Sequence, residues 1–326
     1  MSLPQGFDPK WKDIPGYING ITHDIWEDRN IHGLQEFYAP DLIVRSLVSV
    51  VQGNTGIIAA TQSTLAEFPD RKLLGEDVIW ADTGDESFLS SHRLLCTATH
   101  TGPGMYGAPT ERKLRYRILA DCWCKANAVH DEWLVRDQAA IVDQMGHDIW
   151  DWTRDLIARE GGADQCVRPF TPANDVTGPY QSSGNKHPLG LRGADILVNI
   201  FDGGTGILQS SHDRAALGHF PKHETDHGIG FAEQFWLPLR TSFPNAKFKV
   251  THKIGMSGDM LPHRAALRWT LHGAHDGQGR FGKPTGAEVF IMGITHFEFG
   301  PRGVIKEWTL IDDTAVIKQI LLQTES

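Results

Sequence analysis

Two aspartates, Asp137 and Asp312, stand 175 residues apart at the same place in two similar stretches of the chain. Each comes four residues after a tryptophan, Trp133 or Trp308, so aspartate and tryptophan lie on the same face of an extended strand. A carboxylate beside a tryptophan loses solvation, which raises its pKa and suits it to take a proton near neutral pH. The alternative is structural, because each aspartate also precedes a predicted helix, where Asp is a favoured N-cap.

A second titratable position lies sixteen residues before each of these aspartates, on the preceding predicted strand. In the second stretch it is His296, and in the first it is Asp121. We predict an acid–base pair of His296 with Asp312, and a carboxylate pair of Asp121 with Asp137 that shares a proton. Because a neutral imidazole can give or take a proton near pH 7, the second stretch is the predicted working site and the first its packing partner. The alternatives are that these side chains face outward, or that the two sites are equally active or equally empty.

Two arginines, Arg93 and Arg268, lie inside otherwise apolar predicted strands. One interpretation is a cation in the pocket that holds a substrate carboxylate or an enolate. The other is an ion pair with Glu132 or Glu307, which also occur in both stretches.

The histidines His100 and His275 each open a glycine-rich loop that contains an aromatic residue. Repeated glycines favour a shaped loop at the mouth of a pocket. The candidate substrate-binding residues are Arg268, His275, Trp308, Phe281, Arg93, His100, Tyr106 and Trp133.

Spacing of four residues puts His219, His223 and His227 on one side of an extended or helical segment. A metal site is one interpretation. A polar loop in water is the one we favour, so no metal and no cofactor is predicted. The cysteines Cys122 and Cys124 share a strand face without a second pair at zinc-site spacing, so buried free thiols are expected.

The elements that must position these residues repeat as well. Without gaps, seven of the eighteen positions from 93 to 110 are identical 175 residues later, so a whole domain is duplicated. In the first copy, apolar periodicity predicts helices over 17–38, 55–68 and 138–145. Strands are predicted over 78–80, 87–100, 112–125 and 129–136. Helices followed by antiparallel strands indicate an α+β fold, in which a curved antiparallel sheet and the N-terminal helices surround a pocket.

The 326 residues are enough for two domains, and 40% hydrophobic with 22% charged residues is typical of a globular protein. The predicted units are residues 1–150 and 192–326. Residues 151–191 contain a helical extension and a Gly/Pro-rich linker. The net charge of −9 and the absence of a Lys/Arg run argue against a nucleic-acid partner, and no apolar stretch is long enough for a membrane helix.

The motifs resemble those of SnoaL-like polyketide cyclases, which belong to the nuclear transport factor 2-like superfamily. The resemblance rests on Leu65-x-x-Phe68-Pro69-Asp70, on Arg93-x6-His100, on the loop from Gly102 to Thr110, on Glu132-Trp133-x-x-x-Asp137, and on their counterparts in the second copy. It implies paired α+β cones and ring closure by a metal-free aldol reaction, with the catalytic carboxylate on Asp137 and Asp312.

The sequence thus predicts a cytoplasmic, cofactor-independent enzyme that acts on a small carbonyl compound by carboxylate and histidine acid–base catalysis. Aldol cyclisation, isomerisation, dehydration and hydrolysis all fit these groups. The alternative is a non-catalytic module that binds a small molecule or mediates association. The expected partners are a small-molecule substrate and the other domain of the same chain, with a homo-oligomer left open.

Overall fold

A computed structural model describes residues 3–258 and 260–325. The first half contains α1 (Ile14–Trp26), α2 (Gly33–Phe37), β1 (Tyr38–Ser46), β2 (Ser49–Gln52), α3 (Asn54–Glu67), β3 (Lys72–Gly84), β4 (Ser87–Thr99), β5 (Lys113–Lys125), β6 (Ala128–Arg136) and α4 (Gln138–Gln144). After α5 (Ile149–Arg159), the same order returns in α6 (Pro188–Asp202), α7 (Ile207–Ser211), β7 (His212–Phe220), β8 (Glu224–His227), α8 (Ile229–Ser242), β9 (Lys247–Gly258), β10 (Leu261–Ala274), β11 (Glu288–Gly300), β12 (Gly303–Leu310) and α9 (Asp313–Thr324).

Each half forms one six-stranded sheet, and the two sheets have the same strand order. The orders are β2-β1-β6-β5-β4-β3 and β8-β7-β12-β11-β10-β9. The predicted α+β duplication is therefore confirmed, but each sheet is mixed rather than antiparallel, because β1 pairs in parallel with β6 and β7 with β12. The prediction missed β1 and β2 and their counterparts, whose hairpins follow directly on short helices.

Local signals explain where the helices begin. The Asp13 carboxylate accepts a 2.7 Å hydrogen bond from the Gly16 amide at the start of α1, and Ile14, Ile18 and Ile25 are buried on one face of the helix. Predicted caps are also present at α4 and α9, where the side chains of Asp137 and Asp312 accept bonds from the first-turn amides.

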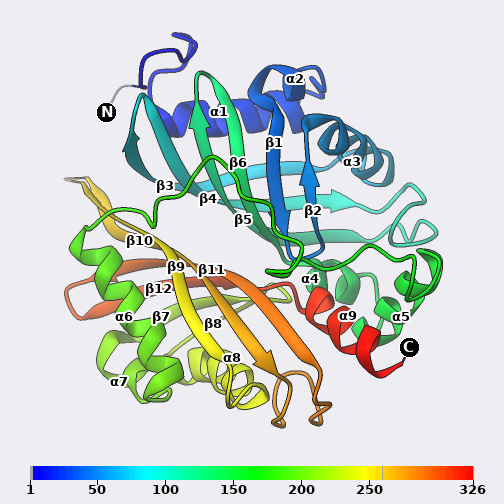
Figure 1. The fold of residues 1–326 in the computed structure, drawn as a ribbon. Coiled ribbons are helices and arrows are strands. Elements are labelled where there is room, and N and C mark those ends of the chain that lie inside the picture. Colours follow the sequence, from blue (N-terminus) through cyan, green and yellow to red (C-terminus); the bar gives the residue numbers. More distant parts are fainter. Residues whose placement is uncertain (1–2, 259, 326) are drawn as a thin grey trace.

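The two sheets pack face to face, with α1–α3 on the outer side of one and α6–α8 on the outer side of the other (Figure 1). A buried cluster between them contains Ile79 and Leu89 from the first sheet and Ile254 and Ala266 from the second. At one end, α9 packs against α4 and α5. Both faces of each sheet are thus covered, one by its own helices and the other by the second sheet.

The segment between α5 and α6 is also packed against the protein. The Phe170 amide donates to the Leu47 carbonyl at 3.0 Å, and the Tyr180 hydroxyl, between the sheets, bonds His252 at 2.7 Å. The helix α6 begins at Pro188, before the predicted limit at residue 192, and the limits of the two units remain a prediction. Within the described part of the chain, no helix is both long and apolar enough to cross a lipid bilayer.

Candidate active site

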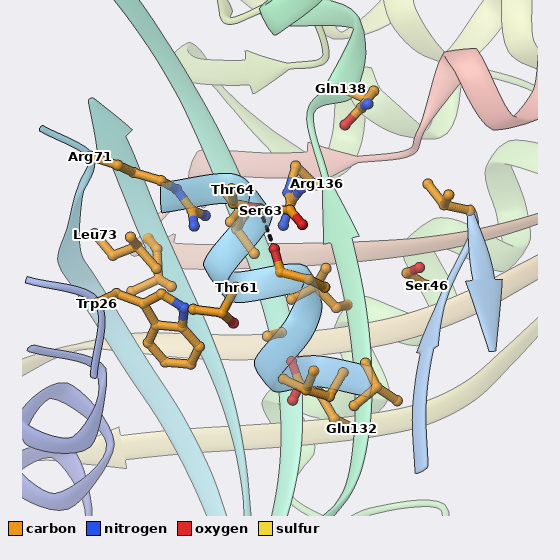
Figure 2. Close-up of a pocket in the computed structure, with 18 of the residues that line it drawn as sticks. Trp26, Ser46, Thr61, Ser63, Thr64, Arg71, Leu73, Glu132, Arg136 and Gln138 are labelled. Carbon is orange, nitrogen blue, oxygen red and sulfur yellow. Dashed lines mark hydrogen bonds between the residues drawn. The ribbon is translucent and has the colours of Figure 1, made fainter. Parts of the chain in front are cut away.

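A cavity of about 590 Å³ lies inside the first unit, between its sheet and α1 and α3 (Figure 2). This is within the usual size range of small-molecule sites. Most of its wall is apolar. The titratable and hydroxyl side chains that line it are Thr22, Tyr38, Ser46, Ser49, Thr61, Ser63, Thr64, Glu67, Arg71, His92, Tyr106, Tyr116, Cys122, Glu132, Arg136 and Asp312.

Strand register orders the main polar groups along the cavity. Glu132 on β6 lies level with Cys122 on β5, and Leu134 lies level with Ala120, which is paired in turn with His92 on β4. Arg136 is four residues beyond Glu132 on the same strand and face, which corresponds to about 13 Å. The cavity therefore has a carboxyl at one level, an imidazole at the next and a guanidinium beyond it.

The Glu132 carboxyl is buried and has no basic side chain within ion-pair distance among the described residues. Burial raises the pKa of Glu132 to about 7, although the Tyr38 hydroxyl and the charge of Arg136 act in the opposite direction. At neutral pH this group is divided between its acid and base forms, as a catalytic proton acceptor requires.

The equivalent residue of the second unit, Glu307, is held by three donors. Its carboxylate accepts from Trp236 Nε1 at 2.8 Å, from Thr309 Oγ1 at 2.8 Å and from His212 Nε2 at 3.1 Å. In the first unit, Thr61 stands in place of Trp236, Leu134 in place of Thr309 and Phe37 in place of His212. Leu134 and Phe37 have no side-chain donor, so two of the three donors are lost. Glu307 is thus held by hydrogen bonds in the second unit, whereas Glu132 faces the cavity of the first unit.

His92 supplies an imidazole in the same cavity. It is buried, and no hydrogen-bond partner is found for its Nδ1 among the described residues. Burial lowers the pKa of His92 to about 4, so the ring is neutral at physiological pH and can donate from one nitrogen and accept at the other. The equivalent residue of the second unit is Leu267.

In the described part of the second unit, large side chains occupy several of the positions that line this cavity in the first unit. The clearest replacement is Leu94 by Trp269, which is fully buried and lies against Trp236 with ring centroids 5.7 Å apart. A Cβ on Gly293 would lie 2.1 Å from the Trp269 ring, so the backbone itself makes room for this indole. Other cavity-lining residues with aromatic counterparts in place of smaller side chains include Ala60 (Phe235), Thr61 (Trp236), Leu73 (Phe248) and Cys122 (Phe297). These replacements do not support the prediction that the second unit holds the working pocket, and which unit works remains a prediction.

Arginine and tryptophan residues from the two units stack reciprocally between the sheets. The guanidinium of Arg93 lies 3.6 Å from the ring centre of Trp308, and that of Arg268 lies 3.7 Å from Trp133. These four predicted substrate-binding residues face away from the cavity, because they occupy the other face of their strands. The predicted ion pairs with Glu132 and Glu307 are wrong for the same reason: Arg93 pairs with Glu76 at 3.0 Å and Arg268 with Asp121 at 2.8 Å.

The two predicted catalytic pairs are not formed. Asp121 pairs with Trp133 on the neighbouring strand, and Trp133 is four residues, or about 13 Å, before Asp137. In the second unit, His296 pairs with Trp308, which is four residues before Asp312. Asp121 is paired with Arg268, as given above. His296 bonds Ser91 Oγ at 2.8 Å and Arg93 Nη1 at 3.3 Å across the interface. Both side chains hold the two sheets together.

The two terminal aspartates differ in their surroundings. Asp137 caps α4 and accepts 2.9 Å bonds from the amides of Lys222 and His223 in the second unit, so it joins the two halves. Asp312 caps α9 and also lines the cavity of the first unit. Burial raises the pKa of Asp137 to about 7 and that of Asp312 to about 6. Of the four predicted catalytic residues, only Asp312 reaches the cavity.

One protein-family model matches part of the first unit. Residues 18–145 match the model of the SnoaL-like polyketide cyclase family.

Solved structures of similar proteins match parts of the chain as well. IdmH of Streptomyces antibioticus, a candidate polyketide cyclase, is 22% identical over 40% of this chain and 97% of its own, with a TM-score of 0.35. AclR of Streptomyces galilaeus, a candidate hydroxylase, is 19% identical over 40% of this chain and 80% of its own, with a TM-score of 0.36. A SnoaL-like polyketide cyclase of Agrobacterium tumefaciens is 17% identical over 40% of this chain and 97% of its own, with a TM-score of 0.33. A search of curated proteins gave no match.

The glycine-rich loop of the first unit closes one end of the cavity. The Glu67 carboxylate accepts from the amides of Met105 and Tyr106, and a Cβ on Gly102 would lie 2.0 Å from the Ala66 carbonyl oxygen. These contacts place Tyr106 in the cavity wall, where it was predicted to bind substrate.

The histidines that open the two loops support them from outside the cavity. His100 bonds Thr110 at 3.0 Å, and its Nε2 lies 3.3 Å from Glu67. His275 bonds Thr285 at 3.1 Å, and Phe281 packs on Phe243. The positions of His100 and His275 do not support their predicted binding roles, because neither histidine lines the cavity of the first unit.

The histidine triplet of the second unit does not converge on one point. His219 stacks on Trp308 with ring centroids 5.0 Å apart and bonds Thr225, while His227 is exposed on β8. Among the described residues, these three do not form a group with metal-ligand spacing.

Sequence reasoning missed Glu132, His92 and Arg136 as site residues, because it chose the other face of their strands. Alternation cannot identify the cavity face when both faces are buried. One signal was available in the repeat itself. At some of the positions that line the cavity, such as Leu94 and Ala60, the second copy has a much larger residue, Trp269 or Phe235.

Proposed function

We propose that the first unit is a cofactor-independent enzyme that takes a proton from a carbon beside a carbonyl group, with Glu132 as the base. The observation that supports this most directly is a cavity carboxyl that has no ion-pair partner and a pKa of about 7. A buried carboxylate of this basicity is suited to proton transfer at neutral pH.

The neutral imidazole of His92 is proposed to donate a hydrogen bond to the carbonyl oxygen. As Glu132 takes the proton from carbon, the electron pair of the C–H bond moves into the carbonyl group, and negative charge develops on its oxygen. A fixed donor in an apolar cavity stabilises this enolate more than it stabilises the ketone. Its lowered pKa keeps His92 from becoming an imidazolium that would attract the carboxylate and lower its basicity.

Ring closure would then follow by an intramolecular aldol step. The enolate carbon forms a bond with a second carbonyl carbon of the same molecule, and the oxygen of that carbonyl takes the proton back from Glu132. The step needs no oxidant and no metal, and the carboxylate is regenerated. Among proton-transfer reactions, cyclisation is the one that the name of the matched family favours.

The second unit is proposed to be a non-catalytic packing partner, the reverse of the predicted division. This proposal is supported by the large side chains packed in the interior of the second unit and by the three hydrogen bonds that hold Glu307. Its contribution to the site is Asp312 at the cavity wall. Four free, buried cysteines fit a reducing compartment, and we propose the cytoplasm.

Proton exchange from carbon tests the proposed function without knowledge of the natural substrate. In deuterium oxide, the protein should exchange the acidic C–H protons of small 1,3-diketones, followed by proton NMR. Glu132→Gln should lower this rate by about 100-fold or more. The matched variant Glu307→Gln, checked for folding by circular dichroism, should keep it. Equal rates in Glu132→Gln and the wild type, or no exchange above the buffer rate, would contradict the proposal.

The pH dependence of exchange gives a second test. Because the base must be ionised, kcat/KM should rise with pH and level off above a midpoint near 7, the pKa of Glu132.

A further inference from the structure

The end of the cavity farthest from Glu132 carries two arginines without a counter-ion. Arg71 is 3% exposed and Arg136 is half-buried, and neither lies within ion-pair distance of a carboxylate among the described residues. Figure 2 shows their guanidinium groups beside α3, one from the residue before β3 and one from the end of β6. A buried guanidinium normally has an anionic partner, so the unpaired Arg71 with the half-buried Arg136 in the same cavity indicates a place for an anion.

Unused donor atoms mark the same place. The Arg136 Nε and the Tyr106 hydroxyl are buried, and neither has a hydrogen-bond partner among the described residues. Arg71 Nε donates to the Tyr116 hydroxyl at 2.8 Å. Burial raises the pKa of Tyr116, and the positive charges of Arg71 and Arg136 both act against this rise. Both guanidinium groups therefore lie near the Tyr116 phenol. An oxyanion between them would satisfy donors that otherwise remain costly to bury.

The second unit supplies a comparison at these positions. The counterparts of Arg71, Tyr106, Tyr116 and Arg136 are Ala246, Phe281, Ile291 and Ile311. All four polar side chains are replaced by apolar ones in the second unit. The four groups are therefore not needed to build the fold, and they accompany the cavity.

We propose that the cavity binds a molecule with an apolar body and a carboxylate, held by Arg71 and Arg136 with Tyr106 and Tyr116. The inference rests on the proposed function in that it describes the substrate of the same cavity. The apolar body would lie against Leu73, Leu94 and Ile118. Since Arg136 is about 13 Å along the strand from Glu132, the carboxylate is an anchor remote from the reacting carbon. Binding energy from such a remote group orients the carbon for proton transfer.

A pair of probes of nearly equal shape tests the carboxylate without any variant. By isothermal titration calorimetry, 2-naphthoate should bind the full chain with a Kd about tenfold or more below that of 2-naphthamide. Equal affinities, or no binding of 2-naphthoate, would overturn the proposal. Inorganic phosphate serves as the second oxyanion, and the apolar requirement predicts that it binds more weakly than 2-naphthoate. Tighter binding of phosphate would also overturn the proposal.

Variants locate the site. Arg136→Met should weaken 2-naphthoate binding about tenfold or more and leave 2-naphthamide binding within about twofold. Arg71→Met should do the same. The matched control is Arg115→Met, because Arg115 is exposed on the same strand as Tyr116. Unchanged 2-naphthoate binding in Arg136→Met would refute the site.

The two proposals can fail separately. Glu132→Gln should keep selective 2-naphthoate binding while proton exchange is lost. If exchange depends on Glu132 but binding does not depend on the arginines, the carboxylate site is wrong and the proposed function stands. If binding depends on the arginines but Glu132→Gln exchanges at the wild-type rate, the carboxylate site stands and the proposed function is wrong.

Discussion

Glu132 and Glu307 occupy the same position in two sheets of the same topology, yet only Glu307 has a complete set of hydrogen-bond donors. A buried carboxylate with its donors stabilises a fold, and one without them costs stability. The pair therefore compares a structural and a candidate catalytic role within one chain.

The first prediction concerns stability and pH. The pKa of Glu132 is about 7 in the folded state and 4.5 in the unfolded state. Between these values the folded state holds a proton that the unfolded state has lost, so this group makes stability fall as pH rises from about 4.5 to 7. Glu132→Gln removes this contribution. Its free energy of unfolding, relative to wild type, should increase by about 3 kcal/mol from pH 4.5 to pH 8. Urea unfolding at several pH values measures this, and a difference independent of pH would show that the carboxyl is solvated.

The second prediction exchanges the contents of the two interiors. Because Ile118 stands in the first unit where Gly293 makes room for Trp269, the double variant Leu94→Trp/Ile118→Gly is needed to place the same indole there, and it should abolish binding of 2-naphthamide and 2-naphthoate. Trp269→Ala should cost about 3–5 kcal/mol, because it opens a void in a packed core. Calorimetry and urea unfolding measure the two effects. Unchanged binding of 2-naphthoate in Leu94→Trp/Ile118→Gly would mean that this cavity is not where 2-naphthoate binds.

The third prediction concerns the ion pair between the sheets. Arg268→Met leaves the buried Asp121 without its partner and should cost about 3–5 kcal/mol. The double variant Arg268→Met/Asp121→Leu replaces the whole pair with apolar groups and should recover most of that loss. Equal losses in the single and double variants would show that the stacking of Arg268 on Trp133 is the more important contact.

The fourth prediction separates Asp137 from catalysis. Asp137→Ala removes a helix cap and the acceptor of two amides from the other unit, and should cost about 1–3 kcal/mol. Hydrogen exchange at Lys222 and His223 should become faster. Proton exchange from 1,3-diketones should change little in Asp137→Asn, since this side chain does not line the cavity. A loss comparable to that in Glu132→Gln would return Asp137 to the catalytic site.

Much of the fold was predictable, because its signals are local or repeated. The predicted helix at 55–68 and strands at 87–100, 112–125 and 129–136 lie within about one residue of α3, β4, β5 and β6. The hairpin of β1 and β2 was not predicted. Its first strand pairs in parallel with β6, about 90 residues later, and such a partner leaves no local pattern.

The site was less predictable, because its identity depends on which face of a strand meets the cavity. Arg93 and His92 are neighbours in sequence, and both are buried. The first stacks on Trp308 between the sheets, while the second lines the cavity. Which of the two side chains faces the cavity depends on which side of the first sheet the second sheet covers. That packing brings together residues about 200 positions apart, such as Arg93 and Trp308.

The face-to-face pairing of the two units has a consequence for how such a protein can change. In a symmetric dimer, every substitution at the interface occurs twice, so both members of a contact must tolerate it. Here Asp121 faces Arg268, while its counterpart His296 faces Arg93 and Ser91. Because both units are encoded in one chain, one interior could be filled by tryptophan while the other stayed open. In a symmetric dimer, one such substitution would fill both interiors at once.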